Sequence, residues 1–321
     1  MPAMDWIEGK SPAAHALEGL LGQVAGSSVP VLLQGESGSG KSSAAREIHG
    51  RSAQRGEPLI ETQLSTLAPT LIESELFGHS AGAFTGAQRA RAGRFQRAGA
   101  GTIVLDGIET LAEELQVKLL RVLQERVVEP VGSEEALPLE ARVIATSGVD
   151  LREAVRAGRF RGDLYFRLAV VVIEVPPLRA RGDDLELFAV RILAAAAARL
   201  GVAPRALGAD ALARLCAHRW PGNLRELENA LERVLVLGAG RAGAIEAAEF
   251  EFLDETRADA LLPLARTLLA RGIALADFER ALYAEALRES RGNVSAAARA
   301  LGLSRKAFEH RQSRAGGGDE A

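Results

Sequence analysis

The feature that most constrains the fold is a glycine-rich segment, GESGSGKS, at residues 35–42. It follows the apolar run VPVLLQG (29–35), which is typical of a buried strand, and it precedes a segment with helical character. The spacing G-x-x-x-x-G-K-S is that of a loop whose backbone N–H groups enclose phosphates at the start of a helix. The chain has four lysines against 35 arginines, and Lys41 stands where a compact positive charge would reach the phosphates.

A second apolar run, GTIVLD at residues 101–106, ends in a carboxylate. Asp106 and Ser42 are therefore the expected ligands of a magnesium ion bound with the nucleotide. We expect ATP and Mg²⁺ as cofactors of an α/β fold. The expected nucleotide contacts in the glycine-rich segment are Gly35, Glu36, Ser37, Gly38, Ser39, Gly40, Lys41 and Ser42.

Two further apolar runs, ARVIATS (141–147) and AVVVIEVP (169–176), alternate with helical patterns such as EELQVKLLRVLQE (113–125). Continuous apolar strands joined by helices indicate a parallel sheet covered on both faces. The expected organisation is an α/β nucleotide-binding part at 1–176, a helical part at 177–237, a linker at 238–262, a C-terminal helical domain at 263–314 and a disordered tail at 315–321.

The segment RGNVSAAARALGLSRKAFEHRQSR (291–314) is basic within a chain of net charge −3, since it holds five arginines and Lys306 against one glutamate. Its apolar residues have helical spacing on both sides of Gly302 and Ser304, a C′ residue and an N-cap. This pattern predicts a helix-turn-helix whose second helix enters the major groove of double-stranded DNA. The expected DNA contacts are Ser304, Arg305, Lys306, Glu309, His310 and Arg311.

Several motifs resemble those of the AAA+ activators of sigma-54 RNA polymerase, the bacterial enhancer-binding proteins. They are ESELFGHSAGAFTGA (73–87), GRFRGDLYFRL (158–168), PPLRARGDDL (176–185) and WPGNLREL (220–227). The resemblance spans about residues 8–237, and the C-terminal segment resembles the Fis-type helix-turn-helix of the same family. It implies an AAA+ P-loop sheet with a helical lid, joined to a small all-α DNA-binding domain.

The resemblance also implies roles for single residues. Arg161 and Arg167 would be arginine fingers that reach the γ-phosphate of a neighbouring subunit, and Arg225 would be the sensor arginine of the lid. Such contacts between subunits imply a homo-oligomer, from dimer to hexamer, or a mixed ring. The loop that would contact sigma-54 RNA polymerase consists of Gly82, Ala83, Phe84, Thr85, Gly86 and Ala87.

Three positions depart from the pattern of the family. Gly107 replaces the glutamate expected after Asp106, Gln63 replaces an asparagine, and Ser147 with Gly148 replaces a Thr-Asn pair. Glu109 lies two residues beyond the expected glutamate and is the candidate substitute. Because the altered residues handle water and γ-phosphate, we expect ATP binding with weak intrinsic hydrolysis.

The sequence thus favours a sigma-54-dependent transcriptional activator, and two alternatives remain. One is a non-hydrolysing regulator that binds ATP and DNA, as a scaffold or within a mixed ring. The other is an ATP-dependent remodelling enzyme for which DNA binding is incidental. The start of the chain lacks a signal-peptide pattern, no apolar run reaches about 18 residues, and Cys216 is the only cysteine. We therefore expect a cytoplasmic protein without a membrane partner.

Overall fold

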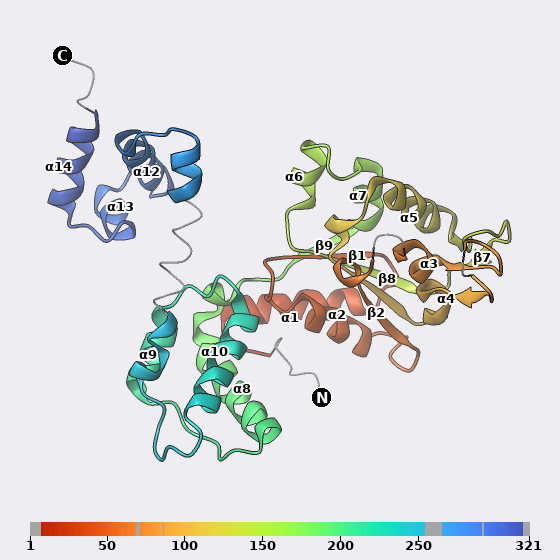
Figure 1. The fold of residues 1–321 in the computed structure, drawn as a ribbon, viewed down its shortest axis with the longest axis horizontal. Coiled ribbons are helices and arrows are strands. Elements are labelled where there is room, and N and C mark those ends of the chain that lie inside the picture. The colour runs from red at the N-terminus through yellow and green to blue at the C-terminus, as the bar shows by residue number, and fades with distance from the viewer. Residues whose placement is uncertain (1–7, 69–70, 86, 254–264, 291, 317–321) are drawn as a thin grey trace. The chain divides into compact units, whose positions relative to one another are not determined.

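A computed structural model describes residues 8–68, 71–85, 87–253, 265–290 and 292–316. Gly86 of the GAFTGA segment, most of the second half of the expected linker and residues 317–321 of the tail lie outside the described residues. The chain divides into two compact units, Met1–Phe250 and Glu251–Ala321. The first contains the sheet, helices that cover it and a group of helices beside it, and the second is helical in its described part (Figure 1).

A parallel five-stranded sheet is the centre of the first unit, as the apolar runs predicted. Its strand order is β2-β5-β8-β1-β9. The strands are β1 (Val31–Gln34), β2 (Leu59–Gln63), β5 (Thr102–Asp106), β8 (Arg142–Ser147) and β9 (Val171–Glu174). Four of them fall within the four predicted runs. The edge strand β2, LIETQ, was missed because its exposed position permits polar residues that interrupt the apolar pattern.

The strand register brings polar residues together at one edge of the sheet. Asp106 at the end of β5 pairs with Gln63 of β2 on one side and with Thr146 of β8 on the other. Gln34 at the end of β1 pairs with Ser147. Since carboxyl ends of parallel strands share an edge, residues distant in sequence meet where a doubly wound sheet binds its ligand.

Helices cover both faces of the sheet and bury alternate residues of each strand. Val104 of β5 packs into a cluster with Leu17 and Ile48, whereas Leu105 packs into the opposite cluster with Leu119 and Leu164. The first cluster joins α1 (Pro12–Ala25) and α2 (Lys41–Gly50) to the sheet. The second cluster joins α5 (Glu113–Glu125) and α7 (Gly162–Leu168) to the sheet. Helix α5 has the predicted bounds, and α6 (Leu151–Arg156) precedes α7.

The GAFTGA segment lies between two short helices and two very short strands. The elements are α3 (Ile72–Phe77), β3 (Gly78–His79), β4 (Arg91–Ala92) and α4 (Arg94–Ala98). The expected interruption of a helical region is therefore present, with an antiparallel β3–β4 pair at its base. A second antiparallel pair, β6 (Val127–Val128) and β7 (Leu137–Pro138), follows α5.

The helical part of the first unit extends further than the sequence predicted. It contains α8 (Leu185–Leu200), α9 (Ala209–Ala217), α10 (Asn223–Leu237) and the 3₁₀ segments η3 (Leu178–Asp184) and η4 (Ala247–Phe250). Residues 245–250 were expected in a linker, yet Ile245 and Phe250 are buried and Glu249 pairs with Arg205 at 2.8 Å. The glycine- and alanine-rich composition of 238–250 has no clear period, and this concealed the packing.

The second unit contains three helices with a small core of its own. They are α12 (Leu275–Glu289), α13 (Val294–Ala300) and α14 (Arg305–Gly316). Tyr283 of α12 meets Phe308 of α14 edge to face, with ring centroids 5.3 Å apart. Gly302 has φ +67° and Ser304 Oγ accepts from the N–H of Ala307 at 3.2 Å, so the predicted turn and N-cap are confirmed.

Candidate nucleotide-binding site

The glycine-rich loop joins β1 to α2 in a conformation that other residues would resist. Gly38 and Gly40 have φ of +76° and +103°, in the left-handed region that favours glycine. A Cβ at Gly38 would also lie 2.3 Å from the carbonyl oxygen of Gly222, in the loop before α10. These glycines therefore allow both the turn and its close contact with the helical part.

Lys41, at the first position of α2, is buried and points back into the loop. Its Nζ donates to the carbonyl oxygens of Gly35 at 2.7 Å and Glu36 at 2.9 Å. Burial lowers the pKa of Lys41, while the carboxylates of Asp106 and Glu109 oppose that shift. An ammonium group held by backbone carbonyls in a partly dry site is suited to binding phosphate oxygens.

A cavity of 310 Å³ opens beside Lys41, large enough for the phosphates of a nucleotide. Three parts of the first unit line it. From the glycine-rich loop and α2 come Ser37, Gly38, Gly40, Lys41, Ser42 and Ser43. From the strand ends come Gln63, Ser65, Asp106, Gly107, Glu109, Thr146 and Gly148, and from α10 come Leu224, Arg225 and Glu228.

Two expected magnesium ligands, Ser42 and Asp106, both line this cavity. A hydroxyl and a carboxylate, completed by phosphate oxygens and water, form the hard oxygen donor set that Mg²⁺ requires. Asp106 Oδ1 accepts a hydrogen bond from Thr146 Oγ1, which fixes the carboxylate. Thr146 was missed from the sequence, although the strand register would place it beside Asp106.

Gly107 turns the chain sharply after Asp106. It has φ +79° and ψ 46°, and the 3₁₀ turn η2 (Ile108–Thr110) follows it. The N–H of Thr110 donates to the Gly107 carbonyl at 3.0 Å. The turn brings Glu109 back to the cavity, where Oε1 accepts from the N–H of Gly148 at 2.8 Å.

One departure from the family pattern, Gly148, contacts this glutamate. A Cβ at Gly148 would lie 3.0 Å from Glu109 Oε1, so a larger residue there would displace the carboxylate. Glu109 Oε2 is buried and has no hydrogen-bond partner among the described residues. Gln63 also lines the cavity, whereas the Ser147 hydroxyl donates to the carbonyl of Val149 and lies outside the cavity lining.

Residues that begin α10 contact the glycine-rich loop directly. Arg225 Nη1 donates to Ser37 Oγ at 2.9 Å, and the N–H of Leu224 donates to the Gly38 carbonyl at 3.0 Å. Asn223 Nδ2 donates to the Ser37 carbonyl at 3.0 Å. The expected sensor arginine therefore lies at the cavity, held by the loop that would contain the phosphates.

The carboxylate of Glu36 binds residues of the helical part of the first unit. Its carboxylate accepts two hydrogen bonds from Arg179, at 2.7 and 2.5 Å, and one from Asn223 at 3.1 Å. The Arg179 hydrogen bonds, followed by that of Asn223, lower the pKa of Glu36 to about 2. Glu36, like Gly35 and Ser39, is absent from the residues that line the cavity, and its carboxylate links the loop to the helical part.

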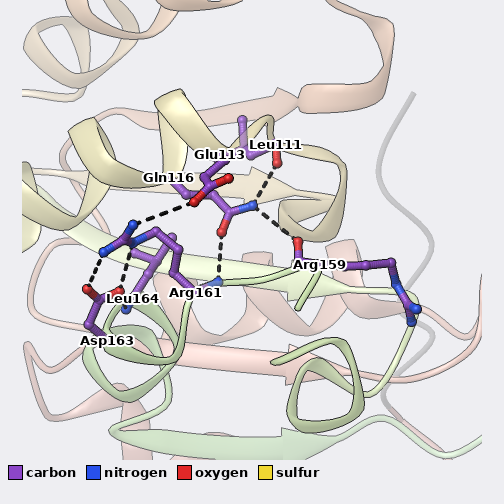
Figure 2. A network of polar contacts seen from close by, with 7 residues as sticks. All are labelled: Leu111, Glu113, Gln116, Arg159, Arg161, Asp163 and Leu164. Atoms are coloured by element: carbon purple, nitrogen blue, oxygen red, sulfur yellow. Dashed lines mark hydrogen bonds and ion pairs between the residues drawn. The ribbon is translucent and has the colours of Figure 1, made fainter. Parts of the chain in front are cut away.

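The two expected arginine fingers, Arg161 and Arg167, do not line the cavity. Arg161 donates to Asp163 at 2.8 and 3.1 Å and lies 3.8 Å from a Glu113 oxygen (Figure 2). Arg167, in the last turn of α7, donates from Nε to the Leu123 carbonyl at 3.1 Å. Each guanidinium is thus held by a partner within the same chain.

The GAFTGA segment presents an aromatic side chain. Phe84 is 41% exposed, and its ring meets His79 edge to face at 5.0 Å between centroids. Gly82 has φ +82°, and its N–H donates to the Ala87 carbonyl at 2.8 Å, which closes the loop. Thr85 is exposed and Ala87 is buried, so the described part of the loop has a closed base and an open tip.

The residues expected to contact DNA lie on the outer face of the second unit. Arg305 pairs with Glu309 one turn later on α14, at 2.9 Å. Phe308 between them is buried against Tyr283 and the alanines of α13. The six expected contacts, Ser304, Arg305, Lys306, Glu309, His310 and Arg311, are all exposed.

Three family models match the chain in the order of these parts. The Sigma-54 interaction domain matches residues 7–174, the AAA+ ATPase lid domain residues 179–260, and the Fis family of bacterial regulatory proteins residues 274–311. The chain belongs to the sigma-54-dependent transcriptional activators. The resemblance inferred from the motifs is confirmed, and the lid match past residue 237 agrees with the packing of Ile245 and Phe250.

This activator is similar to several curated regulators. It is 44% identical over 302 residues to the C4-dicarboxylate transport transcriptional regulatory protein DctD of Pseudomonas aeruginosa. It is 42% identical over 311 residues to the transcriptional regulatory protein ZraR of Escherichia coli K12. These matches cover 93% and 95% of this chain but only 62% of DctD and 68% of ZraR.

Among solved structures, the activator resembles NtrX from Brucella abortus, with a TM-score of 0.73 and 30% identity over 97% of this chain and 69% of NtrX. Similar NtrX structures hold ADP or ATP. The likeness confirms the fold. Among the described helices, none combines the length and apolar character needed to cross a lipid bilayer.

Proposed function

We propose that this activator binds ATP with Mg²⁺ in the 310 Å³ cavity and uses the bound state to engage sigma-54 RNA polymerase. The observation that carries the proposal is the convergence of Lys41, Ser42, Asp106 and Arg225 on that one cavity. Lys41 would bind the β- and γ-phosphates, Arg225 would reach the phosphates from α10, and Ser42 with Asp106 would hold the ion. Bound magnesium would neutralise phosphate charge.

Intrinsic hydrolysis is proposed to be slow. In hydrolysis the water oxygen attacks the γ-phosphorus, the bond to the bridging oxygen breaks, and a proton leaves the water. Glu109 is the carboxylate available to accept that proton, since Gly107 has no side chain. Its Oε1 is held by Gly148 and its Oε2 is buried, so the carboxylate must turn before it can meet the water, and this lowers the rate.

Oligomerisation would complete the site. Arg161 and Arg167 lie outside the lining of their own cavity, so in this proposal they act on the nucleotide of a neighbouring subunit. Arg161 would exchange its bonds to Asp163 for bonds to the γ-phosphate. We propose a homo-oligomer, up to a hexamer, or a mixed ring in which a partner supplies its own water-orienting glutamate.

The contacts with the transcription machinery would come from two surfaces. The GAFTGA loop would touch sigma-54 through Phe84 and Thr85, which are both exposed in the described part of the loop. The outer face of α14 would bind double-stranded DNA, with Arg305 and His310 at base edges and Arg311 at a phosphate.

The test is formation of a complex with purified sigma-54 in the presence of ADP and aluminium fluoride, which together imitate the transferring phosphoryl group. Wild type is expected to retain sigma-54, and Lys41→Ala is expected to lose both ATP binding and sigma-54. Lys10→Ala is the matched control, since the Lys10 side chain is exposed and does not line the cavity. Equal retention by wild type and Lys41→Ala would contradict the proposal.

A regulator that binds ATP without hydrolysing it is the second candidate, and Gly107 is the observation that favours it. Both candidates require ATP binding and DNA binding. They differ in turnover, which the activator retains at a low rate and the scaffold lacks. Phosphate release above the level of Lys41→Ala would exclude the scaffold.

A further inference from the structure

Gln116 of α5 joins two segments that serve different nucleotide sites in the proposed oligomer. Its side chain is 2% exposed. The amide Nε2 donates to the Leu111 carbonyl at 2.8 Å and to the Arg159 carbonyl at 3.4 Å. Oε1 accepts from the backbone N–H of Arg161 at 2.9 Å, so both ends of the amide are used (Figure 2).

The first segment is the turn that begins at Gly107 and carries Glu109. The N–H of Thr110 donates to the Gly107 carbonyl at 3.0 Å, and that of Leu111 to the Ile108 carbonyl at 3.3 Å. Glu109 attaches this turn to Gly148 at the cavity. Gln116 attaches its other end through Leu111, so the turn is held at two anchors.

The second segment connects α6 to α7 and contains Arg161. The N–H of Arg159 donates to the Ala154 carbonyl at 2.9 Å, and Phe160 is buried in the core. The backbone of Arg161 is therefore fixed by Gln116, while its guanidinium is held at the surface by Asp163. A shift of this backbone would change where the guanidinium can reach.

A buried amide that bonds both segments transmits displacement between them. If either segment moves alone, a buried carbonyl or N–H loses its partner, and a buried polar group without a partner is costly. We propose that Gln116 is a positioning residue that couples the turn at a subunit's own nucleotide to the Arg161 that the subunit offers its neighbour. This inference rests on the proposed roles of Glu109 and Arg161.

The experiment uses mixed oligomers of two full-length variants. The donor carries Lys41→Ala, so it binds no ATP but keeps its arginines. The acceptor carries Arg161→Ala and Arg167→Ala, so it binds ATP but cannot supply fingers. Gln116→Met, which keeps side-chain length and removes all three hydrogen bonds, is then placed in the donor or in the acceptor.

Two controls accompany these mixtures. Gln124→Met makes the same change at an exposed position of α5. Gln116→Glu keeps an acceptor for the Arg161 N–H and removes the Nε2 donor, and it replaces Gln116→Met if thermal denaturation shows that the latter does not fold. ATP affinity of the acceptor is measured in each mixture, because a purely structural defect would lower it.

The unmodified donor is expected to restore turnover in the acceptor. Gln116→Met is expected to lower the restored rate about 10–100-fold in either subunit, as for a misplacement of about 1 Å, with unchanged ATP affinity and no effect of Gln124→Met. If the unmodified donor restores nothing, the finger assignment fails and the coupling fails with it. If the unmodified donor restores turnover but Gln116→Met has no effect in the donor or no effect in the acceptor, the coupling alone is overturned. The same holds if Gln116→Met lowers the ATP affinity of the acceptor as much as it lowers turnover.

Discussion

Replacing Gly107 by alanine is expected to destabilise the first unit through the backbone alone. Gly107 has φ +79°, where an L-residue is less stable by about 1–2 kcal/mol. An added Cβ would meet only Thr110, at 4.0 Å, so no clash contributes. Alanine also restricts the unfolded chain, and this offsets about 0.4–1 kcal/mol of the lost stability. The net expectation is a loss of about 1 kcal/mol, or about 2–4 °C in Tm.

Two matched variants separate this reason from a general effect of substitution. Gly107→Asn should lose less stability than Gly107→Ala, since asparagine tolerates the left-handed region. Gly19→Ala, within α1 where an added Cβ meets nothing within 4 Å, should gain about 0.5–1 kcal/mol. Urea unfolding of the full chain, monitored at the transition of the first unit, measures the stability of all three variants. A Gly107→Ala variant at least as stable as Gly107→Asn would refute the left-handed turn.

The same geometry affects the most direct gain-of-function test. Gly107→Glu would restore a carboxylate next to Asp106, but the new residue must adopt the left-handed conformation or open the turn. Opening the turn would release Glu109 from Gly148. We therefore expect higher turnover together with lower stability, and a smaller gain than a simple return of the glutamate would give.

Three further outcomes are expected. Phe84→Ala should abolish sigma-54 retention in the aluminium fluoride assay while ATP affinity stays unchanged; retained complex would exclude a contact by Phe84. Arg305→Ala should lose about 1–3 kcal/mol of preference for one base position in duplexes selected from a random library, and unchanged preference would exclude a base contact there. The pKa of Glu36 is depressed to about 2, so its stabilising bond with Arg179 is present above about pH 4.5 and is lost as the pH falls toward 2. The stability difference between wild type and Glu36→Gln should therefore shrink over that interval, and a difference independent of pH would contradict this reasoning.

Much of the fold follows from local pattern. Continuous apolar runs located four of the five strands, and the spacing in EELQVKLLRVLQE gave α5 its bounds. The edge strand β2 and the packed residues 245–250 were missed, because each depends on neighbours from distant parts of the chain. Local patterns do not report such tertiary contacts.

The candidate site was predictable where a motif fixes the backbone. The glycine-rich loop led directly to Lys41 and Ser42, and the end of β5 led to Asp106. Thr146 and Gln116 could not be found in this way, because their roles arise from strand register and from hydrogen bonds across the fold. The bonds of the Glu36 carboxylate to Arg179 likewise became visible only in three dimensions, because they join residues 143 positions apart in the sequence.

The central claim is that this activator binds ATP well and hydrolyses it slowly through Glu109. The most direct measurement is steady-state phosphate release beside ATP affinity, for wild type, Glu109→Gln and the exposed control Glu114→Gln. We predict turnover well below about 1 s⁻¹, a further loss in Glu109→Gln of about 10²-fold or more, and equal affinity in all three. Turnover of about 1 s⁻¹ or faster in wild type, unchanged in Glu109→Gln, would contradict the account.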